Sequence, residues 1–388
     1  MATVTIFHIS DLHLFVDEQG VHGSVPEIGA RARISLACAK RATSRLRRLG
    51  VPAKFFATNP GPDEYAIRGM AAHNGEALDS LEVDLPALVE EELATSDCVV
   101  VACTGDIENF GRTGRNAAPY PGIDHLQTSI ADVVQASGAH FIAVHGNHDL
   151  WPGVWPGLAD IGELKVNATR LANHPLLANW QPDVTEVAAN GHSVAVSRVN
   201  TVSTNRLAAV FAKGSLDAHP PQRPREVEAL LATIGSAFSA GAGTIGIAVT
   251  HHPVHNFAPT NFVHATASGG LRSRDQLAAA LKDCNVVLAG HRHRVDPPNP
   301  VTTSQLPLDQ TVIQLAAGST LQEAEGNFSD ESYSFNRYRL STSEEEGTET
   351  FAISRTVFRH SDTQGIRDGG SFVESDPGEV VLADRIPL

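Results

Sequence analysis

Five short segments of the chain carry acidic, amide or imidazole side chains at spacings that suit metal ligands. They are Asp11-Leu12-His13, Gly105-Asp106-Ile107-Glu108-Asn109, Gly146-Asn147-His148-Asp149, His251-His252-Pro253 and Gly290-His291-Arg292-His293. Side chains two positions apart on extended backbone share a face, so Asp11 and His13 can reach one ion together. Mixed carboxylate, amide and imidazole ligands suit borderline divalent ions such as Mn, Fe, Zn or Co, and these segments offer no thiolate. The pattern favours a centre that holds two divalent metal ions.

Each segment on its own also has an ordinary structural explanation. An Asp-x-His after a strand is most often surface polarity, and a Gly-Asp pair is most often a turn. The chain has 18 histidines, so chance pairs are expected. The joint pattern is different, because every segment directly follows an apolar run that predicts a strand. The carboxyl ends of strands in an open α/β sheet meet along one edge, where these side chains can converge.

The apolar runs predict short buried strands, and helices are expected between them. The strands are expected at Val4–Ile9, Cys98–Cys103, Phe141–Val144, Val194–Val199, Ile245–Thr250 and Val286–Ala289. Helices are expected at residues 27–49, 76–94, 124–137, 224–238 and 273–282. The alternation of strand, helix and strand is typical of a parallel sheet layered by helices.

The spacing of these elements predicts the domain organisation. Residues 1–295 hold all five segments and are expected to form the core, with an insertion at about residues 17–95 because the interval after His13 is long for one crossover. Residues 151–190, rich in Pro, Gly, Asn and Trp, predict a long ordered loop with a short helix. Residues 296–388 are expected to be a β-rich continuation that completes or caps the core. Its tail, from about Asp362, is polar and Gly-rich and is expected to be poorly ordered.

Composition and charge narrow the class of protein and of substrate. The 388 residues, 42% hydrophobic and 19% charged, are typical of a globular protein with one large domain or two. The 44 acidic and 29 basic residues give a net charge of -15, which argues against binding of long nucleic acids but allows a small anionic substrate beside metal ions. The four cysteines show no CxxC spacing, so reduced thiols and a cytoplasmic location are expected. Neither a basic leader nor a membrane-spanning apolar stretch is expected.

Taken in chain order, the five segments resemble the motifs of the calcineurin-like metallophosphoesterase superfamily. The resemblance runs from Asp11 to His293, about three-quarters of the chain. It implies an α/β fold (α+β by some schemes) built as a four-layer α/β/β/α sandwich of two mixed β-sheets flanked by helices. It also implies a dinuclear metal centre at the strand ends, and it says little about the insertion or the region after Val295.

The resemblance implies roles for single residues. The implied ligands are Asp11, His13 and His293 for one ion, Asn147, His251 and His291 for the other, and Asp106 as a bridge between both. His251 is preferred to His252 because the family's ligand stands two positions before the proline, and His252 is the alternative. His148 is expected to face the phosphate and to help the leaving oxygen by hydrogen bonding or protonation.

One position departs from the family's pattern. Many relatives carry Asp where this chain has Asn109, and in some branches that acid orients and charges the catalytic histidine. An amide can orient an imidazole but cannot stabilise its cationic form equally. We therefore expect His148 to be a weaker acid–base group in this chain, or Asp149 or Glu108 to substitute for the missing acid.

The resemblance implies a metal-dependent phosphoesterase. Two ions held close together can share a hydroxide, lower the pKa of its parent water and place it in line with a phosphorus atom. The expected substrate is a small phosphodiester such as a cyclic nucleotide, by analogy with single-domain bacterial relatives. The alternatives are a phosphomonoesterase or a nucleotide pyrophosphatase and, outside enzymes, a scaffold that kept the fold and lost catalysis. The insertion could carry protein contacts, including those of a homo-oligomer.

Overall fold

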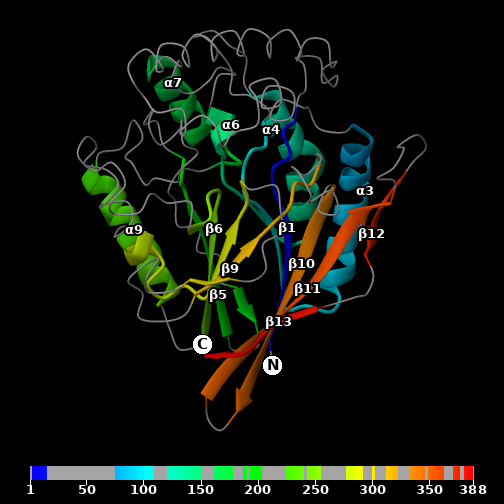
Figure 1. Cartoon of the computed structure of the whole chain (residues 1–388), viewed down its shortest axis with the longest axis vertical. Helices are drawn as coiled ribbons and strands as arrows, with labels where there is room; N and C mark the ends of the chain where they lie inside the picture. The colour runs from blue at the N-terminus through cyan, green and yellow to red at the C-terminus, as the bar shows by residue number, and fades with distance from the viewer. Residues whose placement is uncertain are drawn as a thin grey trace, which may run out of the picture.

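The structure is a computed structural model (Figure 1), and the residues that it describes cover most of the expected strands and site. They are 2–14, 75–108, 120–150, 161–177, 187–189, 192–202, 224–239, 243–254, 277–291, 299–301, 312–321, 333–345, 348–361, 370–375 and 380–387. Asn109 and His293 lie outside them, and so does the helix expected at residues 27–49.

The first sheet combines strands from both ends of the chain. Its strands are β1 (Thr3–Ile9), β2 (Cys98–Cys103), β3 (His140–Ala143), β10 (Ser334–Glu345), β11 (Thr348–His360), β12 (Phe372–Glu374) and β13 (Val380–Pro387). Their order is β12-β11-β10-β1-β2-β3, with β13 also paired to β11. β1, β2 and β3 pair in parallel, whereas β10 pairs antiparallel with both β1 and β11. The sheet is therefore mixed.

The second sheet is built from the middle of the chain. Its strands are β4 (Val187–Ala189), β5 (His192–Val199), β6 (Thr244–Thr250), β7 (Val286–Ala289), β8 (Asn299–Val301) and β9 (Val312–Ala316), in the order β4-β5-β6-β7-β9-β8. The four inner strands pair in parallel, and the two edge strands pair antiparallel with their neighbours. This sheet is also mixed.

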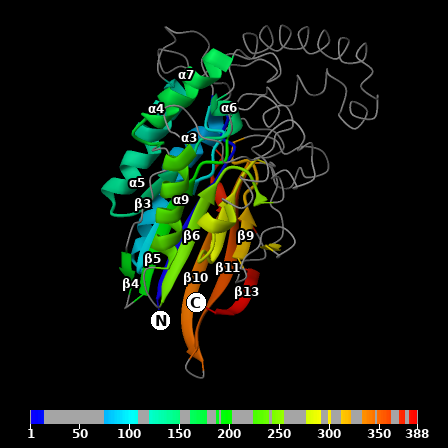
Figure 2. The same cartoon turned by 90° about the vertical axis from the view of Figure 1, so that its left-hand side faces the viewer.

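Helices cover the outer faces of the two sheets, and others lie beyond the upper ends of the strands in Figure 1. They are α3 (Gly75–Leu93), α4 (Pro121–Leu126), α5 (Asp132–Ala136), α6 (Asn147–Leu150), α7 (Ile161–Ala172) and α9 (Pro224–Phe238), with a π-helical turn, η2 (Gln127–Ala131), between α4 and α5. Figure 1 shows α3 and α9 on opposite sides of the sheets, with α6 and α7 beyond the strand ends, and Figure 2 shows the same layers after a 90° turn. α3 contacts β2, and α9 contacts β5 and β6. The expected α/β/β/α sandwich of two mixed sheets is confirmed.

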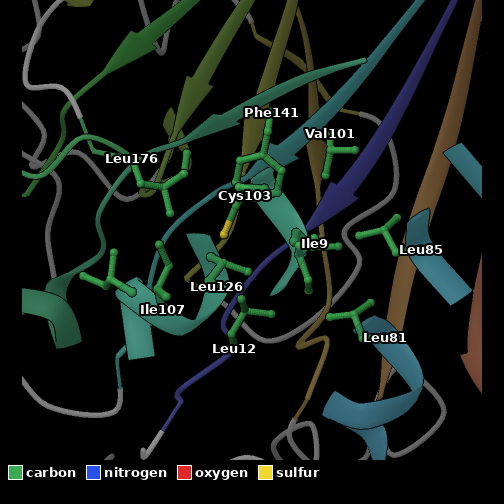
Figure 3. Close-up of a cluster of buried hydrophobic side chains, with 14 of the residues drawn as sticks. Ile9, Leu12, Leu81, Leu85, Val101, Cys103, Ile107, Leu126, Phe141 and Leu176 are labelled. Atoms are coloured by element: carbon green, nitrogen blue, oxygen red, sulfur yellow. The ribbon is translucent and has the colours of Figure 1, made fainter. Parts of the chain in front are cut away.

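Alternating side chains of β1 join the layers. Ile6 packs between the sheets with apolar side chains of the second sheet. Ile9 points to the opposite face and packs among Leu81 and Leu85 of α3, as Figure 3 shows. Full burial of each such side chain stabilises the fold by about 1.5–3 kcal/mol. The core therefore holds β1 firmly, and with it the start of the loop that carries Asp11.

Helix α3 lies within the stretch expected to be an insertion. Leu78, Leu81 and Leu85 of this helix are buried in the same core cluster as the helix-facing side chains of the first sheet. α3 therefore packs as part of the core. The rest of the expected insertion, before Gly75, lies outside the described residues, so its extent stays a prediction.

One further boundary differs from expectation. The helix expected from Asp124 begins at Pro121, because proline is favoured in the first helical turn. The short helix expected within residues 151–190 is the twelve-residue α7. Within the tail expected to be poorly ordered, β12 and β13 both pair with β11.

The described helices and cysteines bear on two other expectations. Among the helices in the described ranges, none has both the length and the apolar character that crossing a membrane requires. Cys98, Cys103 and Cys284 are buried free thiols, and Cys38 lies outside the described residues.

Candidate metal centre

The loops that leave β1 and β2 run side by side. The amide of Asp11 donates to the carbonyl oxygen of Gly105 (3.0 Å), and the amide of His13 donates to the carbonyl oxygen of Asp106 (2.8 Å). These hydrogen bonds continue the parallel pairing of the two strands beyond their ends. Asp11, His13 and Asp106 are therefore held together at one edge of the first sheet, and none is more than 1% exposed.

Backbone strain is concentrated in these loops. The φ angle is 51° at Asp11, 49° at His13, 51° at Asp106 and 75° at His291. Such a left-handed conformation costs a residue other than glycine on the order of 1–3 kcal/mol and persists only where the surroundings impose it. Elsewhere among the described residues, Tyr333 is the only other non-glycine with positive φ. The strain singles out this edge as a candidate functional site.

The turn after β3 brings Asn147 and His148 against Asp106. A Cβ atom on Gly146 would overlap the Asp106 carboxylate, so this crossing requires glycine. The amide of His148 donates to Asp106 Oδ1 (2.7 Å). Asn147 is buried, whereas His148 is partly exposed and its ring packs edge-on against that of His13, with 4.6 Å between the ring centroids. His148 is thus placed between the buried cluster and the solvent.

His251, directly after β6, joins the cluster from the second sheet. Its Nδ1 lies 2.8 Å from the carbonyl oxygen of Thr104, which only accepts hydrogen bonds, so Nδ1 carries a proton. In the neutral ring, Nε2 then presents its lone pair, 2.9 Å from Asn147 Oδ1 and 3.2 Å from His291 Nδ1. A carbonyl behind one ring nitrogen and a lone pair on the other is the usual arrangement of a metal-ligating histidine.

The donor atoms lie close enough together to hold divalent ions. Three groups each have their ligand atoms within 4.8 Å of one another: His13, Asp106 and His148; Asp11, Asp106 and His251; and His251, His252 and His291. Asp106 belongs to the first two groups and His251 to the last two, so the groups form one continuous cluster. Carboxylate, amide and imidazole donors without a thiolate suit borderline divalent ions. The residues present therefore fit the expected two-metal centre.

The structure brings most of the sequence-predicted residues together. They are Asp11, His13, Asp106, Asn147, His148, His251 and His291. Asn109 and His293 lie outside the described residues, so their roles stay predictions. His252 lies in the same cluster, with Nδ1 3.0 Å from the Thr201 hydroxyl and its ring centroid 4.4 Å from that of His291. The contacts of His251 with Asn147 and with Asp106 (3.5 Å) favour His251 as the ligand that faces Asp106.

Asp149 holds the backbone around the cluster. Its Oδ1 accepts a hydrogen bond from the amide of Glu108, and its Oδ2 accepts one from the amide of Gly146, each at 2.6 Å. Burial, together with the charge of Asp106, raises the pKa of the Asp149 carboxyl well above its usual range, and the two amide donors counteract part of that rise. Adjacent side chains on a helix point in different directions. Asp149 therefore has a structural role of its own, and its expected support of the His148 ring stays a prediction.

Glu108 also contacts backbone amides. Its Oε1 accepts hydrogen bonds from the amides of Gly122 (2.7 Å) and Ile123 (3.2 Å). These are among the first amides of α4, which have no acceptor within their own helix. The carboxylate therefore caps α4 and favours the start of this helix at Pro121.

Replacing Asp149 by asparagine is expected to destabilise the fold without shifting the pH profile of catalysis. The amide side chain keeps one acceptor but turns a donor toward one of the two backbone amides, and an unsatisfied buried amide costs about 1–3 kcal/mol. Thermal unfolding measures the loss as a lower Tm. The matched control is Asp97→Asn, because Asp97 is exposed and binds the amide of Thr3 (2.8 Å), so its Tm should change much less. An unchanged Tm with a shifted pH profile would show that Asp149 acts on His148 instead.

Hydroxyl side chains that brace the centre were missed by sequence reasoning. Ser319 Oγ donates to the carbonyl oxygen of Asp11 (2.9 Å), and the hydroxyl of Thr320 accepts from the amide of Ser10 (3.1 Å). Ser319 and Thr320 both follow β9. The end of this strand carries no acid or histidine, so the ligand pattern does not include it. The available signal was two adjacent hydroxyl residues three and four positions after the end of a buried strand.

Comparison with known proteins gives one family and a distant structural likeness. The sequence matches the family model described as calcineurin-like phosphoesterase over residues 4–295. The search of curated proteins gives no match. One similar solved structure is a presumed 5′-nucleotidase from Staphylococcus aureus in complex with alpha-ketoglutarate, with a TM-score of 0.35, 12% identity, and coverage of 99% of this chain and 55% of that chain. This chain thus spans about half the length of that protein, and a likeness at this TM-score carries no argument about function.

Proposed function

The chain belongs to the calcineurin-like phosphoesterase family, and we propose that it uses two divalent metal ions to hydrolyse a small phosphodiester such as a cyclic nucleotide. The proposed ions are drawn from Mn, Fe, Zn and Co. Their proposed ligands are Asp11, His13 and His293 for one ion, Asn147, His251 and His291 for the other, and Asp106 for both.

The observation that carries the proposal is the convergence of donors from separate strands on Asp106. The loop after β1, the turn after β3 and the end of β6 all contact this residue. Convergence of ligands at the carboxyl ends of strands is where an α/β fold places its chemistry. A chain that had lost catalysis would have no reason to keep strained, buried ligands at this edge. This supports an active enzyme over a scaffold.

The chain's own residues orient the substrate and handle its protons. Two divalent ions in the cluster would supply positive charge to the phosphoryl oxygens and activate a water molecule. His148 is partly exposed beside Asp106, and its amide hydrogen bond to that carboxylate fixes the backbone from which its ring projects. We assign His148 the donation of a hydrogen bond or a proton to the leaving oxygen.

The size and type of the substrate have separate support. The net charge of -15 supports a small substrate over a long nucleic acid, which would be repelled. The preference for a diester over a monoester is carried by analogy with single-domain members of the family.

Hydrolysis by the Mn-loaded full chain tests the proposal. We expect kcat/KM for bis-p-nitrophenyl phosphate to exceed that for p-nitrophenyl phosphate by about tenfold or more, a difference of about 1.4 kcal/mol in transition-state binding. A panel of cyclic nucleotides, nucleoside monophosphates and dinucleotide pyrophosphates then identifies the natural class. Faster turnover of monoesters or of pyrophosphates would replace the diester proposal with that alternative. A purified chain that binds no divalent ion and hydrolyses none of these compounds would support the scaffold.

A further inference from the structure

Three buried hydrogen bonds connect the layer between the sheets to Asp11. His8 Nε2 lies 3.0 Å from Thr104 Oγ1, Thr104 Oγ1 lies 2.7 Å from Ser10 Oγ, and Ser10 Oγ lies 2.6 Å from Asp11 Oδ2. All four side chains are 0% exposed. We call His8, Thr104 and Ser10 the positioning chain. Its spacing is set by the parallel register of β1 and β2, which places His8 beside Ala102 and Ile9 beside Cys103.

The direction of these hydrogen bonds follows from the number of protons. An ionised Asp11 can only accept hydrogen bonds, so Ser10 donates its single hydroxyl proton to Asp11 Oδ2. Thr104 must then donate to Ser10, and it must accept from His8, which therefore carries its proton on Nε2. The positioning chain thus runs one way, from the imidazole to the carboxylate.

His8 occupies an apolar layer in which a polar ring is costly. On β1 it shares the face of Val4 and Ile6, which pack between the sheets. Burial lowers the pKa of His8 to about 3, and the negative charge of Asp11 offsets only part of this effect. The ring is therefore neutral at physiological pH and available as a fixed donor. Within the described residues, His8 Nδ1 and both polar atoms of the neighbouring Asn336 side chain have no hydrogen-bond partner.

Ser10 and Thr104 are each tied to more than one part of the centre. The carbonyl oxygen of Thr104 accepts from Nδ1 of His251, so this residue contacts one ligand directly and reaches Asp11 through Ser10. A Cβ atom on Gly290 would overlap the Ser10 hydroxyl, so the backbone at Gly290 packs directly against the positioning chain. The amide of the next residue, His291, donates to both oxygens of Asp11, at 3.2 and 3.1 Å.

We propose that the positioning chain fixes the Asp11 carboxylate in the orientation needed to bind a metal ion, with His8 and Thr104 as positioning residues. Ser10 commits Oδ2 to a short hydrogen bond, whereas Oδ1 accepts the longer bond that it shares from the amide of His291, so Oδ1 keeps a lone pair for the ion. Outer hydrogen bonds of this kind change metal affinity by about 10–100-fold. The inference rests on the proposed function, because it requires the two-metal centre.

Mn²⁺ binding to the full chain separates positioning from a merely structural role. Metal-free protein is titrated with Mn²⁺, free Mn²⁺ is followed by electron paramagnetic resonance, and the Tm of the metal-free protein is measured in parallel. Thr104→Val removes the hydroxyl and keeps the shape, whereas Thr104→Ser keeps the hydroxyl and serves as the rescue. Thr342→Val is the matched control, because the buried hydroxyl of Thr342 binds the amide of Ala2 (2.7 Å) at the opposite end of β1.

Thr104→Val is expected to raise one of the two Mn²⁺ dissociation constants by about tenfold. Thr104→Ser should stay within about twofold of the unmodified chain, because it restores the hydroxyl. Thr342→Val should leave both constants unchanged. His8→Leu provides a second variant: it should raise the same constant by about three- to tenfold, since it lies one hydrogen bond further from the ion. Its Tm should hold or rise, because a hydrocarbon replaces a costly buried polar ring.

Two results would contradict the positioning role, and only one of them would also contradict the proposed function. If the unmodified chain binds Mn²⁺ and the Thr104→Val and His8→Leu variants bind it equally tightly, the positioning role is wrong and the proposed function stands. If the unmodified chain binds no Mn²⁺, Zn²⁺ or Co²⁺, the two-metal centre and the positioning role are both wrong.

Discussion

Asp106→Ala is expected to leave the chain with neither metal ion and to lower kcat/KM for phosphoester hydrolysis by on the order of 1000-fold or more. Asp106 shares one group of ligand atoms with His13 and another with Asp11 and His251. Its carboxylate also accepts the amide of His148 at 2.7 Å. Removal of this side chain therefore takes charge from both ion positions and detaches the turn that carries His148.

Metal content and rate together measure this effect. Dialysed protein is analysed for bound Mn per chain by mass spectrometry, and kcat/KM is measured with bis-p-nitrophenyl phosphate. Asp79→Ala is the matched control, because Asp79 is exposed on α3 and lies in none of the ligand groups found among the described residues. A variant that lacks Asp106 and still binds two ions would contradict the bridging role.

His148→Ala is expected to keep both metal ions and to lower kcat by about 100- to 10,000-fold, the range typical of a lost general acid or base. The ring of His148 is partly exposed at the mouth of the cluster, and the chain offers other donors for each ion. The backbone amide that binds Asp106 survives the substitution. The centre should therefore remain assembled while the leaving oxygen loses its hydrogen-bond or proton donor.

The dependence on the leaving group sharpens this second experiment. Nitrophenolate leaves with little assistance, so the loss of rate should be larger for an alkyl leaving group than for p-nitrophenol if His148 donates a proton. His140→Ala is a suitable control, because His140 is the first residue of β3, at the end of the strand away from the cluster. Metal loss equal to that of Asp106→Ala would make His148 a ligand and would contradict its assignment to the substrate.

The strands could be predicted closely because their signals are local. The runs expected at Cys98–Cys103 and Val286–Ala289 match β2 and β7, and the helix expected at residues 224–238 matches α9. Each is a continuous or periodic apolar stretch with polar, Gly or Pro residues at its ends. An apolar stretch is buried in the core whichever strands or helices it packs against. The local pattern and the tertiary structure therefore agree at these elements.

Boundaries set by distant side chains could not be predicted in this way. The start of α4 depends on the carboxylate of Glu108, which binds amides 14 and 15 residues further along the chain. The expected insertion includes helix α3, because the length of the interval after His13 does not say where an inserted segment begins and ends. Glu108 and Asp149 both bind backbone amides, and these contacts have no local sequence pattern. Both of our expectations, that His148 is a weakened acid–base group or that one of these acids supports it, therefore stay predictions.

The sequence by itself determined which metal-binding groups are available and that they stand at the ends of strands. Both can be read from short stretches of sequence, because a side chain's chemistry and the apolar run before it are local features. Only the tertiary structure decided which atoms meet. His8 reaches Thr104 across 96 positions of sequence, and Ser10 reaches Thr320 across 310. Contacts over such distances leave no local pattern, since they arise from the register of paired strands and the packing of two sheets. The candidate ligands could therefore be proposed from motifs, whereas the buried hydrogen bonds between their segments appeared only in the folded chain.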